Sequence, residues 1–458
     1  MKVCGIVTEY NPFHNGHIYH IQKARELSGC DILVAVMSGN FVQRGEPALL
    51  NKRARCLSAL KNGVDIVFEL PLISTLQSAS HFADDAIHLL TMANIDTLVF
   101  GSESNNLEEL QEIADLPVRV DNLRENLKTG MGFPKAYGLL SSSYMPNDIL
   151  AIAYLKALKG SDITPLSIQR TSEYHSSEMS GPYASATAIR KAMLKDEDVS
   201  AYTVMSADKE HYVTLEMYYP YIRSLLLSLP QPYLNAIFLV DEGIENHLVH
   251  QAQLYDNYND FISHSVTRRY TRSRIQRTLC CLLIQITKDE VRNLPEIDTL
   301  QLLGFNQKGR VYLKELKKQE IRIASCFDQI PLPYRRMQYR ADVLYSMFFK
   351  DQNDFLKKGI EIAGSYYCPH LQEGIISRYA KDCNCRKPKT GLFWKAQEEL
   401  GIDMNRSYAI GDNIRDLSIC NESGVKGILL SDSIAEEFNF IRCKTWNDAI
   451  NVIVGKHN

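Results

Sequence analysis

The sequence predicts an α/β protein that begins with a Rossmann-like, doubly wound parallel sheet. Short, nearly continuous apolar runs recur through the first third of the chain, and each is followed by a polar loop and a helix-like stretch. Such runs are typical of parallel strands buried on both faces, and right-handed crossovers between them give the doubly wound arrangement. In this architecture ligands bind beyond the carboxyl ends of the strands.

Five strands are expected in this region, at 3–8 (VCGIVT), 32–38 (ILVAVMS), 66–70 (IVFEL), 97–101 (TLVFG) and 166–170 (LSIQR). The loops after them are where chemistry is expected: VTEYNPFHNGH, SGNFVQRGEP, ELPL, GSES and QRTSEYHS.

The pattern changes to longer helical periods at about residue 201, in segments such as YIRSLLLSL and TRSRIQRTLCCLLIQI. A small α/β-like piece, QLLGFNQKGRVYLKEL, follows. We therefore expect an α/β domain over 1–200, a mainly α-helical domain over 201–350 and a further α/β segment over 360–458.

Composition narrows the class of protein. The 458 residues exceed one ordinary core, and 45% hydrophobic with 23% charged residues is typical of globular domains. No apolar run approaches the ~20 residues of a bilayer span, and the chain enters a strand directly without signal-peptide features. We expect a cytoplasmic protein with no membrane partner, whose cysteines are reduced thiols or metal ligands. The net charge of −3 means that any nucleic-acid site is a local patch.

The strongest local signal is His14-Asn15-Gly16-His17, between the first strand and a helix. A helix N-terminus offers unpaired N–H groups, glycine lets the backbone approach phosphate, and two imidazoles add hydrogen-bond donors. The pattern favours a nucleotide phosphate site. The alternative is two surface histidines at a helix start.

A second signal is Ser185-Ala186-Thr187-Ala188-Ile189-Arg190, at the start of a later helix. The hydroxyls of Ser185 and Thr187 could hold β- and γ-phosphates, and Arg190 lies one turn further on, within reach of them. The alternative is an ordinary N-cap followed by a solvent-exposed arginine.

The two motifs together resemble the nucleotidylyltransferase superfamily. Seven segments narrow the resemblance to the tRNA(Met) cytidine acetate ligase family, from residue 1 to about 344: VTEYNPFHNGHIYH, SGNFVQRGEPA, NKRARC, FGSES, PNDILAIAYLKAL, SATAIRKAM and TRRYTRSRIQR. The resemblance implies that acetate and ATP form acetyl-adenylate, and that acetyl passes to N4 of the wobble cytidine of elongator tRNA(Met).

The resemblance also implies a set of site residues. His14, His17 and Arg190 would be catalytic, opposing the charge of the departing pyrophosphate. ATP would contact Val7, Thr8, Glu9, Tyr10, Asn11, Pro12, Phe13, His14, Asn15, Gly16, His17, Ile18, Tyr19, His20, Gly101, Asn147 and Arg170, together with Ser185 and Thr187. Mg²⁺ would accompany ATP, although no dedicated carboxylate cage is evident.

Two basic clusters are candidates for tRNA contact. Arg44, Lys52 and Arg53 lie near the nucleotide motif, with Arg55 beside them, and Arg268, Arg269 and Arg272 begin an arginine-rich stretch that continues through Arg274 and Arg277 around Tyr270. We expect the stretch to form one helix. Charge runs are usually solvated helix faces, and it is the resemblance that favours contact with the tRNA backbone. No DNA partner is expected.

The C-terminal segment carries a different pattern. Cys368 and His370, followed by Cys383 and Cys385, provide four ligands suited to a structural Zn²⁺. The alternative is free cysteines.

The CRKPKTG and GDNIRD segments that follow are similar to the later half of haloacid-dehalogenase (HAD) phosphatases of the heptose bisphosphate and histidinol phosphate type. That resemblance implies phosphate binding by Lys387 and magnesium binding by Asp412. The aspartyl nucleophile of those enzymes, in a D-x-D sequence after a strand, is absent from this chain, so we expect a truncated, non-hydrolytic segment.

Two other functions are compatible with these motifs. One is a nucleotidylyltransferase that acts on a small-molecule phosphate, which needs the same phosphate site and no RNA surface. The other is a tRNA-binding protein without catalytic activity.

Overall fold

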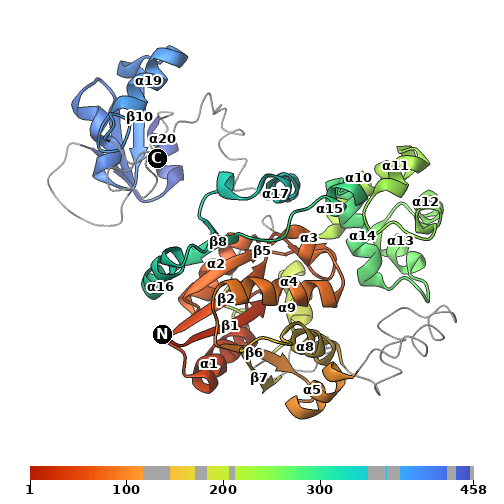
Figure 1. Ribbon diagram of the computed structural model, residues 1–458. Coiled ribbons are helices and arrows are strands. Elements are labelled where there is room, and N and C mark those ends of the chain that lie inside the picture. Colours follow the sequence, from red (N-terminus) through yellow and green to blue (C-terminus); the bar gives the residue numbers. More distant parts are fainter. Residues whose placement is uncertain are drawn as a thin grey trace. The chain divides into compact units, whose positions relative to one another are not determined.

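The computed structural model describes residues 1–116, 145–170, 183–205, 212–348, 368, 382–430 and 440–453. The chain divides into two compact units, Met1–Asn353 and Asp354–Asn458. Figure 1 shows the sheet and helices of the first unit and, separately coloured in blue, the elements of the second. His370 lies outside the described residues.

A seven-stranded sheet forms the centre of the first unit, in the order β7-β6-β1-β2-β5-β8-β9. The five strands expected from the apolar runs pair in parallel. They are β1 (Val3–Thr8), β2 (Ile32–Ser38), β5 (Ile66–Leu70), β6 (Thr97–Ser102) and β7 (Thr164–Gln169). The predicted Rossmann-like, doubly wound class is confirmed.

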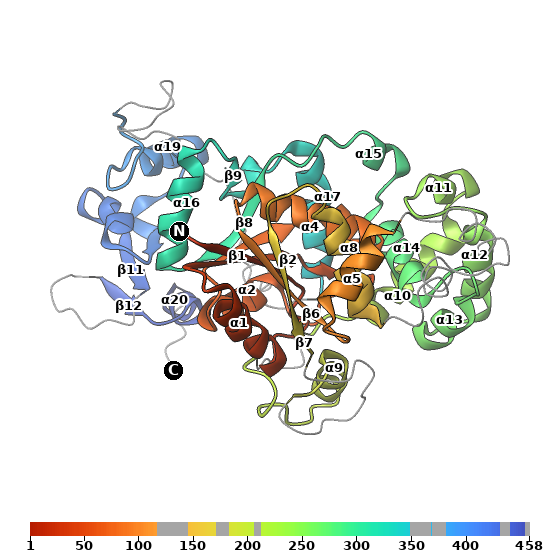
Figure 2. The same ribbon diagram turned by 60° about the horizontal axis from the view of Figure 1, so that its bottom comes forward.

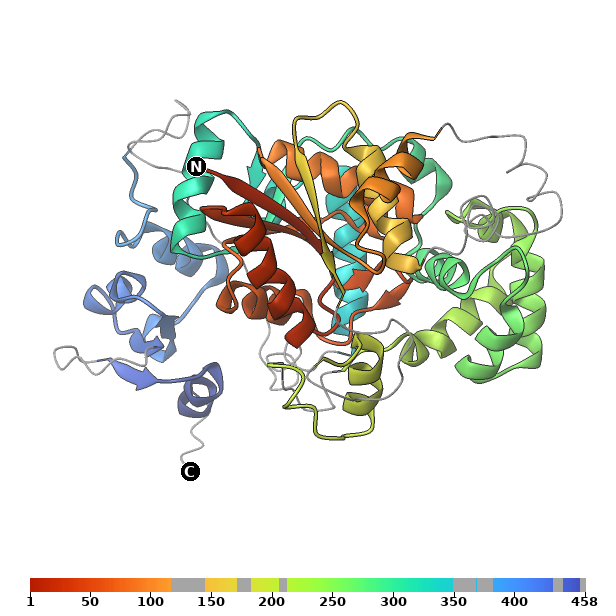
Figure 3. The same cartoon turned by 90° about the horizontal axis from the view of Figure 1, so that it is seen from below.

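Helices cover both faces of this sheet, as Figures 2 and 3 show. One face packs against α4 (Ala79–Met92), α5 (Leu107–Asp115), α8 (Pro146–Ala157) and α16 (Gln307–Lys318). The other packs against α1 (Asn15–Ser28), α2 (Lys52–Lys61) and α9 (Ala186–Leu194). Every residue of β2 and β5 is buried, which explains why those strands read as continuous apolar runs.

The strand order reverses at β1. The chain runs from β1 to β2 and β5 on one side, then crosses back to β6 on the other side of β1. A crevice opens at such a switch point, outside the carboxyl ends of the two strands, and ligands of open α/β sheets bind there. The His14 motif follows β1 directly, so the topology places it at this crevice.

Two strands of the sheet come from the region that follows the helical part. β8 (Leu300–Phe305) pairs antiparallel with β5, and β9 (Ile323–Ala324) pairs parallel with β8. The small α/β-like piece indicated by the sequence is present as β8 and α16, and its strand extends the N-terminal sheet. A short hairpin of β3 (Phe41–Val42) and β4 (Glu46–Pro47) follows β2, and α3 (Leu72–Thr75) follows β5.

A second hydrophobic core unites the helices of residues 212–348 other than α16. They are α10 (Leu215–Ser228), α11 (Gln231–Ala236), α12 (Ile244–Leu254), α13 (Tyr258–Ser265), α14 (Arg272–Ile284), α15 (Lys288–Arg292) and α17 (Leu332–Ser346), with the 3₁₀ helix η2 (Phe327–Gln329) before α17. Phe41 of β3 also belongs to this core. The helical part therefore packs directly against the loop that follows β2.

The second unit contains a parallel three-stranded sheet. Its strands are β10 (Tyr408–Gly411), β11 (Lys426–Leu430) and β12 (Ile441–Cys443), and its helices are α19 (Gly391–Leu400), α20 (Trp446–Ile453) and the 3₁₀ segments η4 (Met404–Arg406) and η5 (Ile414–Asn421). This is the α/β segment expected for the C-terminal part. Across the described residues, no helix combines the length and the apolar character that crossing a bilayer requires.

Candidate active site

A cavity of about 320 Å³ lies at the carboxyl ends of β1 and β6, where the strand order reverses. Sixteen residues expected at the nucleotide or phosphates line it: Val7, Thr8, Glu9, Tyr10, Asn11, His14, Gly16, His17, Tyr19, His20, Gly101, Asn147, Arg170, Ser185, Thr187 and Arg190. Segments from β1, β6, β7, α1, α8 and α9 thus meet in one place.

Four residues of the expected set are absent from the lining: Pro12, Phe13, Asn15 and Ile18. Phe13 is fully buried in the core beneath α1. Asn15 donates its side-chain N–H to the carbonyl of Ala201, 2.8 Å away. These residues hold the entry to α1 in place and do not face the cavity.

The two histidines cap the first turn of α1. The N-cap is His14, with extended backbone (φ −145°, ψ 173°), and its Nδ1 accepts the N–H of Gly16 at 3.1 Å. The Nδ1 of His17 accepts the N–H of His14 at 3.2 Å. This is a capping box built from imidazoles in place of the usual hydroxyl and carboxylate.

The capping bonds fix the tautomer of both rings. A nitrogen that accepts an N–H carries no proton, so the proton of each neutral ring resides on Nε2. The rings stack with centroids 3.8 Å apart and an interplanar angle of 28°, and the ring of Tyr10 meets that of His17 edge-on at 4.8 Å. Two Nε2–H donors are thereby held side by side at the cavity.

Burial keeps these histidines neutral. Burial, followed by the charges of Arg170 and Arg190, lowers the pKa of His14 to about 3. Burial, followed by the charge of His14, holds the pKa of His17 well below its ordinary value. Burial also lowers the pKa of His20 to about 4. His14 is only 6% exposed, which contradicts the alternative of two surface histidines.

Arg190 reaches the cavity from α9. Its Nη1 donates to the carbonyl of Asn11 at 2.7 Å, its Nη2 lies 3.4 Å from the hydroxyl of Thr187, and Glu46 of β4 approaches Nη2 to 3.5 Å. Ser185 caps α9 by accepting the N–H of Ala188 at 3.1 Å. The side chain of Arg190 is 17% exposed, so it is not the solvent-exposed arginine of the alternative.

A second basic group approaches the cavity from the β6–β7 side. Arg170 follows β7 and donates from Nη1 to Oδ1 of Asn147, 2.9 Å away at the N-terminus of α8. A Cβ at Gly101 would lie 3.4 Å from Cγ of Arg170, so the arginine stem crosses directly over this glycine. The three positions therefore form one continuous wall.

Thirteen further residues line the cavity that the sequence did not place at the nucleotide: Val42, Gln43, Arg44, Glu46, Ala79, Phe82, Phe100, Pro146, Leu150, Tyr154, Ile168, Gln169 and Ala186. Of these, Arg44 is expected from the sequence to contact tRNA. Gln43, Arg44 and Glu46 belong to the SGNFVQRGEP loop after β2, so the rule that ligands bind beyond strand ends was the signal that could have found them.

The basic residues expected at tRNA fall into separate environments. Arg53, Arg268, Arg269 and Arg272 are exposed. Lys52 is only 13% exposed, and its Nζ lies 2.9 Å from Glu69 and 2.8 Å from Asp342. Its charge is therefore engaged inside the protein and does not face a tRNA phosphate.

The arginine-rich stretch is not one continuous helix. Arg268 and Arg269 precede α14, which begins at Arg272 behind the N-cap Thr271. Arg277, further along α14, is directed inward and donates to the carbonyl of Gln43 at 3.2 Å. Arg55 of the first cluster is fully buried. The place of an arginine in a basic stretch of the sequence therefore does not indicate whether its side chain faces solvent.

Three thiols converge in the second unit. The Sγ atoms of Cys368, Cys383 and Cys385 lie 3.1 to 3.4 Å from one another. Among the described residues this is the one group of three or more potential metal-ligating side chains whose donor atoms all lie within 4.8 Å of each other. Thiols so placed fit a tetrahedral Zn²⁺, which prefers soft sulfur ligands.

Comparison with known families gives two matches. The HIGH Nucleotidyl Transferase family matches residues 1–358, and a HAD-hydrolase-like family matches residues 384–437.

Similar proteins match over most of their length. A tRNA(Met) cytidine acetate ligase of Thermoanaerobacter sp. (strain X514) is 38% identical over 384 residues, which cover 77% of this chain and 93% of the relative. One from Staphylococcus aureus (strain MRSA252) is 35% identical, covering 69% of this chain and 87% of the relative.

Solved structures agree. The crystal structure of Thermotoga maritima TmcAL in its apo form superposes with a TM-score of 0.69 at 33% identity, covering 76% of this chain and 95% of that chain. The same protein bound with alpha-thio ATP gives a TM-score of 0.67 at 32% identity, with the same coverage.

Proposed function

Because the chain belongs to the tRNA(Met) cytidine acetate ligases of the HIGH nucleotidyl transferase family, we propose that it activates acetate with ATP and acetylates N4 of the wobble cytidine of elongator tRNA(Met). The observation that carries the proposal is the pair of stacked, neutral histidines at the α1 entrance, in a cavity that Arg170 and Arg190 also line. The TmcAL structure bound with alpha-thio ATP supports the use of ATP.

The first step joins acetate to the α-phosphate. A carboxylate oxygen of acetate attacks the α-phosphorus, the bond to the bridging oxygen breaks, and pyrophosphate leaves as acetyl-adenylate forms. Negative charge grows on the phosphate oxygens during this step. The Nε2–H groups of His14 and His17 donate to that charge, the N-terminus of α1 adds its own positive potential, and Arg190 draws the leaving pyrophosphate.

The second step moves the acetyl group. The cytidine amine attacks the acetyl carbon, the bond from that carbon to the adenylate oxygen breaks, and AMP leaves with one proton released. Adenylation is needed because acetate itself is a poor acyl donor and the exocyclic amine is a weak nucleophile. Positioning and electrostatic stabilisation supply the rate, since no covalent protein nucleophile is required.

Oxygen tracing tests this route. Acetate labelled with ¹⁸O in both oxygens should deliver one labelled oxygen to AMP, because the oxygen that attacks the α-phosphorus stays there when the acetyl carbon is released. Label in inorganic phosphate, with ADP as the product, would contradict adenylation. Nucleotide transfer that ignores acetate and proceeds on a small phosphorylated acceptor would identify a different nucleotidylyltransferase. Binding of tRNA without any nucleotide turnover would identify a non-catalytic protein.

We assign tRNA contact to the exposed arginines near the start of α14. Arg268, Arg269 and Arg272 lie in the region 201–350, and Arg53 is exposed at the start of α2 in the region 1–200. Arg274 stacks over the ring of Tyr270, with its guanidinium carbon 4.3 Å from the ring centroid. Arginines of this kind suit the phosphates of a tRNA loop, whose unpaired wobble base is accessible without melting a duplex. A protein of this function works in the cytoplasm.

Metal ions complete the proposal. Mg²⁺ accompanies ATP and neutralises phosphate charge when bound; the triphosphate itself supplies oxygen ligands, as is usual for nucleotide-bound magnesium. Cys368, Cys383 and Cys385 would hold a structural Zn²⁺ in the second unit, with His370 as the fourth ligand expected from the sequence.

We infer that the second unit does not hydrolyse phosphate esters. Lys387 forms an ion pair with Asp416 at 3.0 Å, and Asp412 directly follows β10. The sequence has no D-x-D directly after an apolar strand, where those enzymes carry their aspartyl nucleophile, so a phosphoenzyme cannot form. Robust turnover of nitrophenyl phosphate that depends on Asp412 would contradict this assignment.

A further inference from the structure

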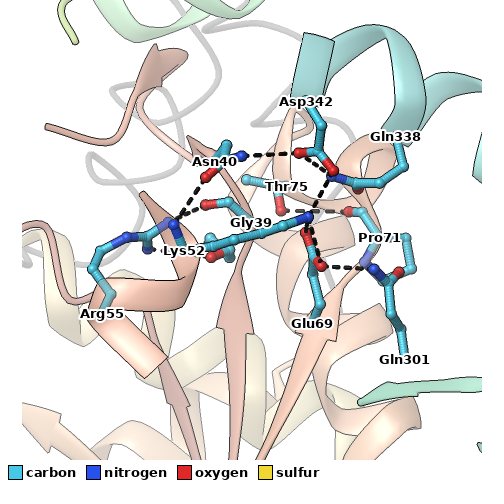
Figure 4. A network of polar contacts seen from close by, with 11 residues as sticks. Gly39, Asn40, Lys52, Arg55, Glu69, Pro71, Thr75, Gln301, Gln338 and Asp342 are labelled. Carbon is cyan, nitrogen blue, oxygen red and sulfur yellow. Dashed lines mark hydrogen bonds and ion pairs between the residues drawn. The ribbon is translucent and has the colours of Figure 1, made fainter. Parts of the chain in front are cut away.

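A buried polar network lies beneath the loop that joins β2 to α2, and Figure 4 shows it from close by. Lys52, at the start of α2, places its Nζ 2.9 and 3.0 Å from the two carboxylate oxygens of Glu69 on β5 and 2.8 Å from Asp342 on α17. Gln301 of β8 donates to Glu69 at 2.6 Å, and Gln338 of α17 donates to Asp342 at 3.0 Å. Residues nearly 300 positions apart in the chain thus share one cluster.

The cluster balances four charges in a region with little water. Arg55 and Glu69 are fully buried, and the side chains of Lys52 and Asp342 are 13% and 27% exposed. Burial alone would lower the pKa of Lys52, but the charges of Glu69 and Asp342 outweigh it and raise that pKa. Ion clusters of this kind add little net stability compared with apolar packing, because each charge loses its hydration. What such a cluster contributes is a fixed arrangement of its side chains and of the elements that carry them.

Asn40 connects this network to the loop. Its side-chain N–H donates to Asp342 at 2.9 Å, and its side-chain oxygen accepts the backbone N–H of Lys52 at 2.9 Å. The backbone carbonyl of Asn40 accepts the N–H of Ala48 at 2.9 Å, which closes residues 40–48 into a loop. Asn40 is therefore held on one side by the network and defines the base of the loop on the other.

Helix α17 contacts both residues that close the loop, Asn40 and Ala48. Asp342 binds the side chain of Asn40, and the hydroxyl of Tyr345, one turn further along, donates to the carbonyl of Ala48 at 2.9 Å. Between these two points the loop carries Gln43, Arg44 and Glu46 into the wall of the nucleotide cavity. Glu46 lies 3.5 Å from Arg190, so a shift of the loop would also move the partner of that arginine.

The opposite side of the loop is held by other elements. The carboxylate of Glu9, at the end of β1, accepts the N–H of Gln43 at 2.6 Å. Gly45 packs against the backbone of α14, where a Cβ would fall 2.2 Å from the nitrogen of Arg277. The loop is thus clamped between the strand that precedes the His14 motif and the helices of residues 212–348.

We propose that Asp342 is a positioning residue for the nucleotide site, which acts through Asn40 to hold the 40–48 loop where Arg44 and Glu46 line the cavity. The inference rests on the proposed use of ATP. It assigns to α17, a helix that lines no part of the cavity, control over the geometry of the adenylation site. Small misplacements of this kind lower rates strongly even when every group that touches the substrate is still present.

The test compares Asp342→Asn with Val343→Ala, an exposed neighbour on the same helix. Asp342→Asn keeps the shape of the side chain and removes its charge. It should raise both the KM for ATP and the ATP dissociation constant measured by calorimetry by about tenfold. It should also lower kcat of acetate-dependent pyrophosphate exchange, by up to the ~100-fold that a misplaced group can cost. Val343→Ala should change none of these. Unchanged constants in Asp342→Asn, whatever its melting temperature, would overturn the proposal.

A double mutant tests the route through the loop. If Asp342 acts by placing Arg44, the Asp342→Asn change should cost much less when Arg44 is already alanine, because coupled positions are non-additive. Equal effects in both backgrounds would overturn the proposal.

If Asp342→Asn fails to fold, Tyr345→Phe removes only the hydroxyl that binds the carbonyl of Ala48 at the other end of the loop. It should also raise the ATP dissociation constant, and an unchanged constant would count against the proposal. A wild type that binds ATP without acetate-dependent exchange would instead reject the proposed reaction while leaving the binding comparison valid.

Discussion

The Nδ1 of His17 accepts the backbone N–H of His14, while the Nδ1 of His14 accepts that of Gly16. The helix start therefore uses one nitrogen of each ring for its own capping and leaves the other, Nε2–H, for the ligand. Structure and chemistry are assigned to different atoms of the same side chain. Substitutions that imitate one nitrogen at a time can separate the two functions.

His17→Asn and His17→Gln form such a matched pair. Asparagine can accept the capping N–H but does not reach the position of Nε2; glutamine can place an N–H donor there. We expect His17→Asn to fold normally and to lose about 100- to 1,000-fold in kcat of pyrophosphate exchange, as removal of one transition-state donor does. His17→Gln should recover part of that loss. Equal activity of the two variants would show that the donor is not what matters.

Stability should depend on pH through the buried histidines. In the unfolded chain they take up protons near pH 6.5, whereas in the folded chain the pKa is about 3 for His14 and about 4 for His20. The unfolded state thus binds more protons between these values, so the free energy of unfolding should fall as pH drops from about 6.5 to about 4. Urea unfolding across this range measures the slope. His20→Asn should make it shallower, the exposed His250→Asn should not, and a slope that His20→Asn leaves unchanged would contradict the burial argument.

Arg190 and Glu46 should have opposite effects on ATP binding. Arg190→Ala removes a charged donor and should raise the KM for ATP about 10- to 100-fold. Glu46→Gln removes a carboxylate that pairs with Arg190 and lines the cavity, so it should not weaken ATP binding and should tighten it modestly. Steady-state kinetics with ATP as the varied substrate measures both. A parallel loss of affinity in the two variants would mean that Glu46 is needed to hold Arg190 in place.

Contact between tRNA and the start of α14 should appear in the salt dependence. Replacing Arg268 and Arg272 with alanine should weaken tRNA binding and make the plot of log affinity against log salt shallower by about one for each arginine that pairs with a phosphate. Acetate-dependent pyrophosphate exchange should stay unchanged, because these residues are absent from the cavity lining. Arg292→Ala, an exposed arginine on α15, is the control. An unchanged salt slope in the double variant would place the tRNA elsewhere.

The thiol cluster should hold about one zinc ion per chain. Elemental analysis of the purified protein should show this metal, and Cys383→Ser should lose it. Cys420→Ser is the control, because Cys420 lies in the same unit but outside the cluster. Zinc retained by Cys383→Ser, or zinc absent from the wild type purified with the metal, would leave the cysteines as free thiols.

The parallel strands and the main cavity could be predicted because their signals are local. A strand buried on both faces needs a continuous apolar run, and a helix that begins beside a phosphate needs a glycine and donors within one turn. Residues 3–8 followed by His14-Asn15-Gly16-His17 contain both signals within a short stretch. The switch point then follows from the order of the strands, since ligands bind where that order reverses.

The rest depends on contacts between distant residues. Gln301 of β8 donates to Glu69 across 232 positions of sequence, and no local period indicates that a segment after the helical part returns to the first sheet. A charged residue type does not indicate whether the side chain is buried either. Lys52 and Arg53 are adjacent in a basic run, yet Lys52 is ion-paired inside the protein and Arg53 is exposed. Tertiary packing decides such cases.

Mass analysis of tRNA(Met) after incubation with ATP and acetate shows whether the complete reaction takes place. The wobble cytidine should gain one acetyl group only when both small molecules are present, and His17→Asn should slow the gain about 100- to 1,000-fold while leaving the protein folded. A wild type that leaves the cytidine unmodified, or a His17→Asn variant that acetylates it at the normal rate, would contradict the proposed function.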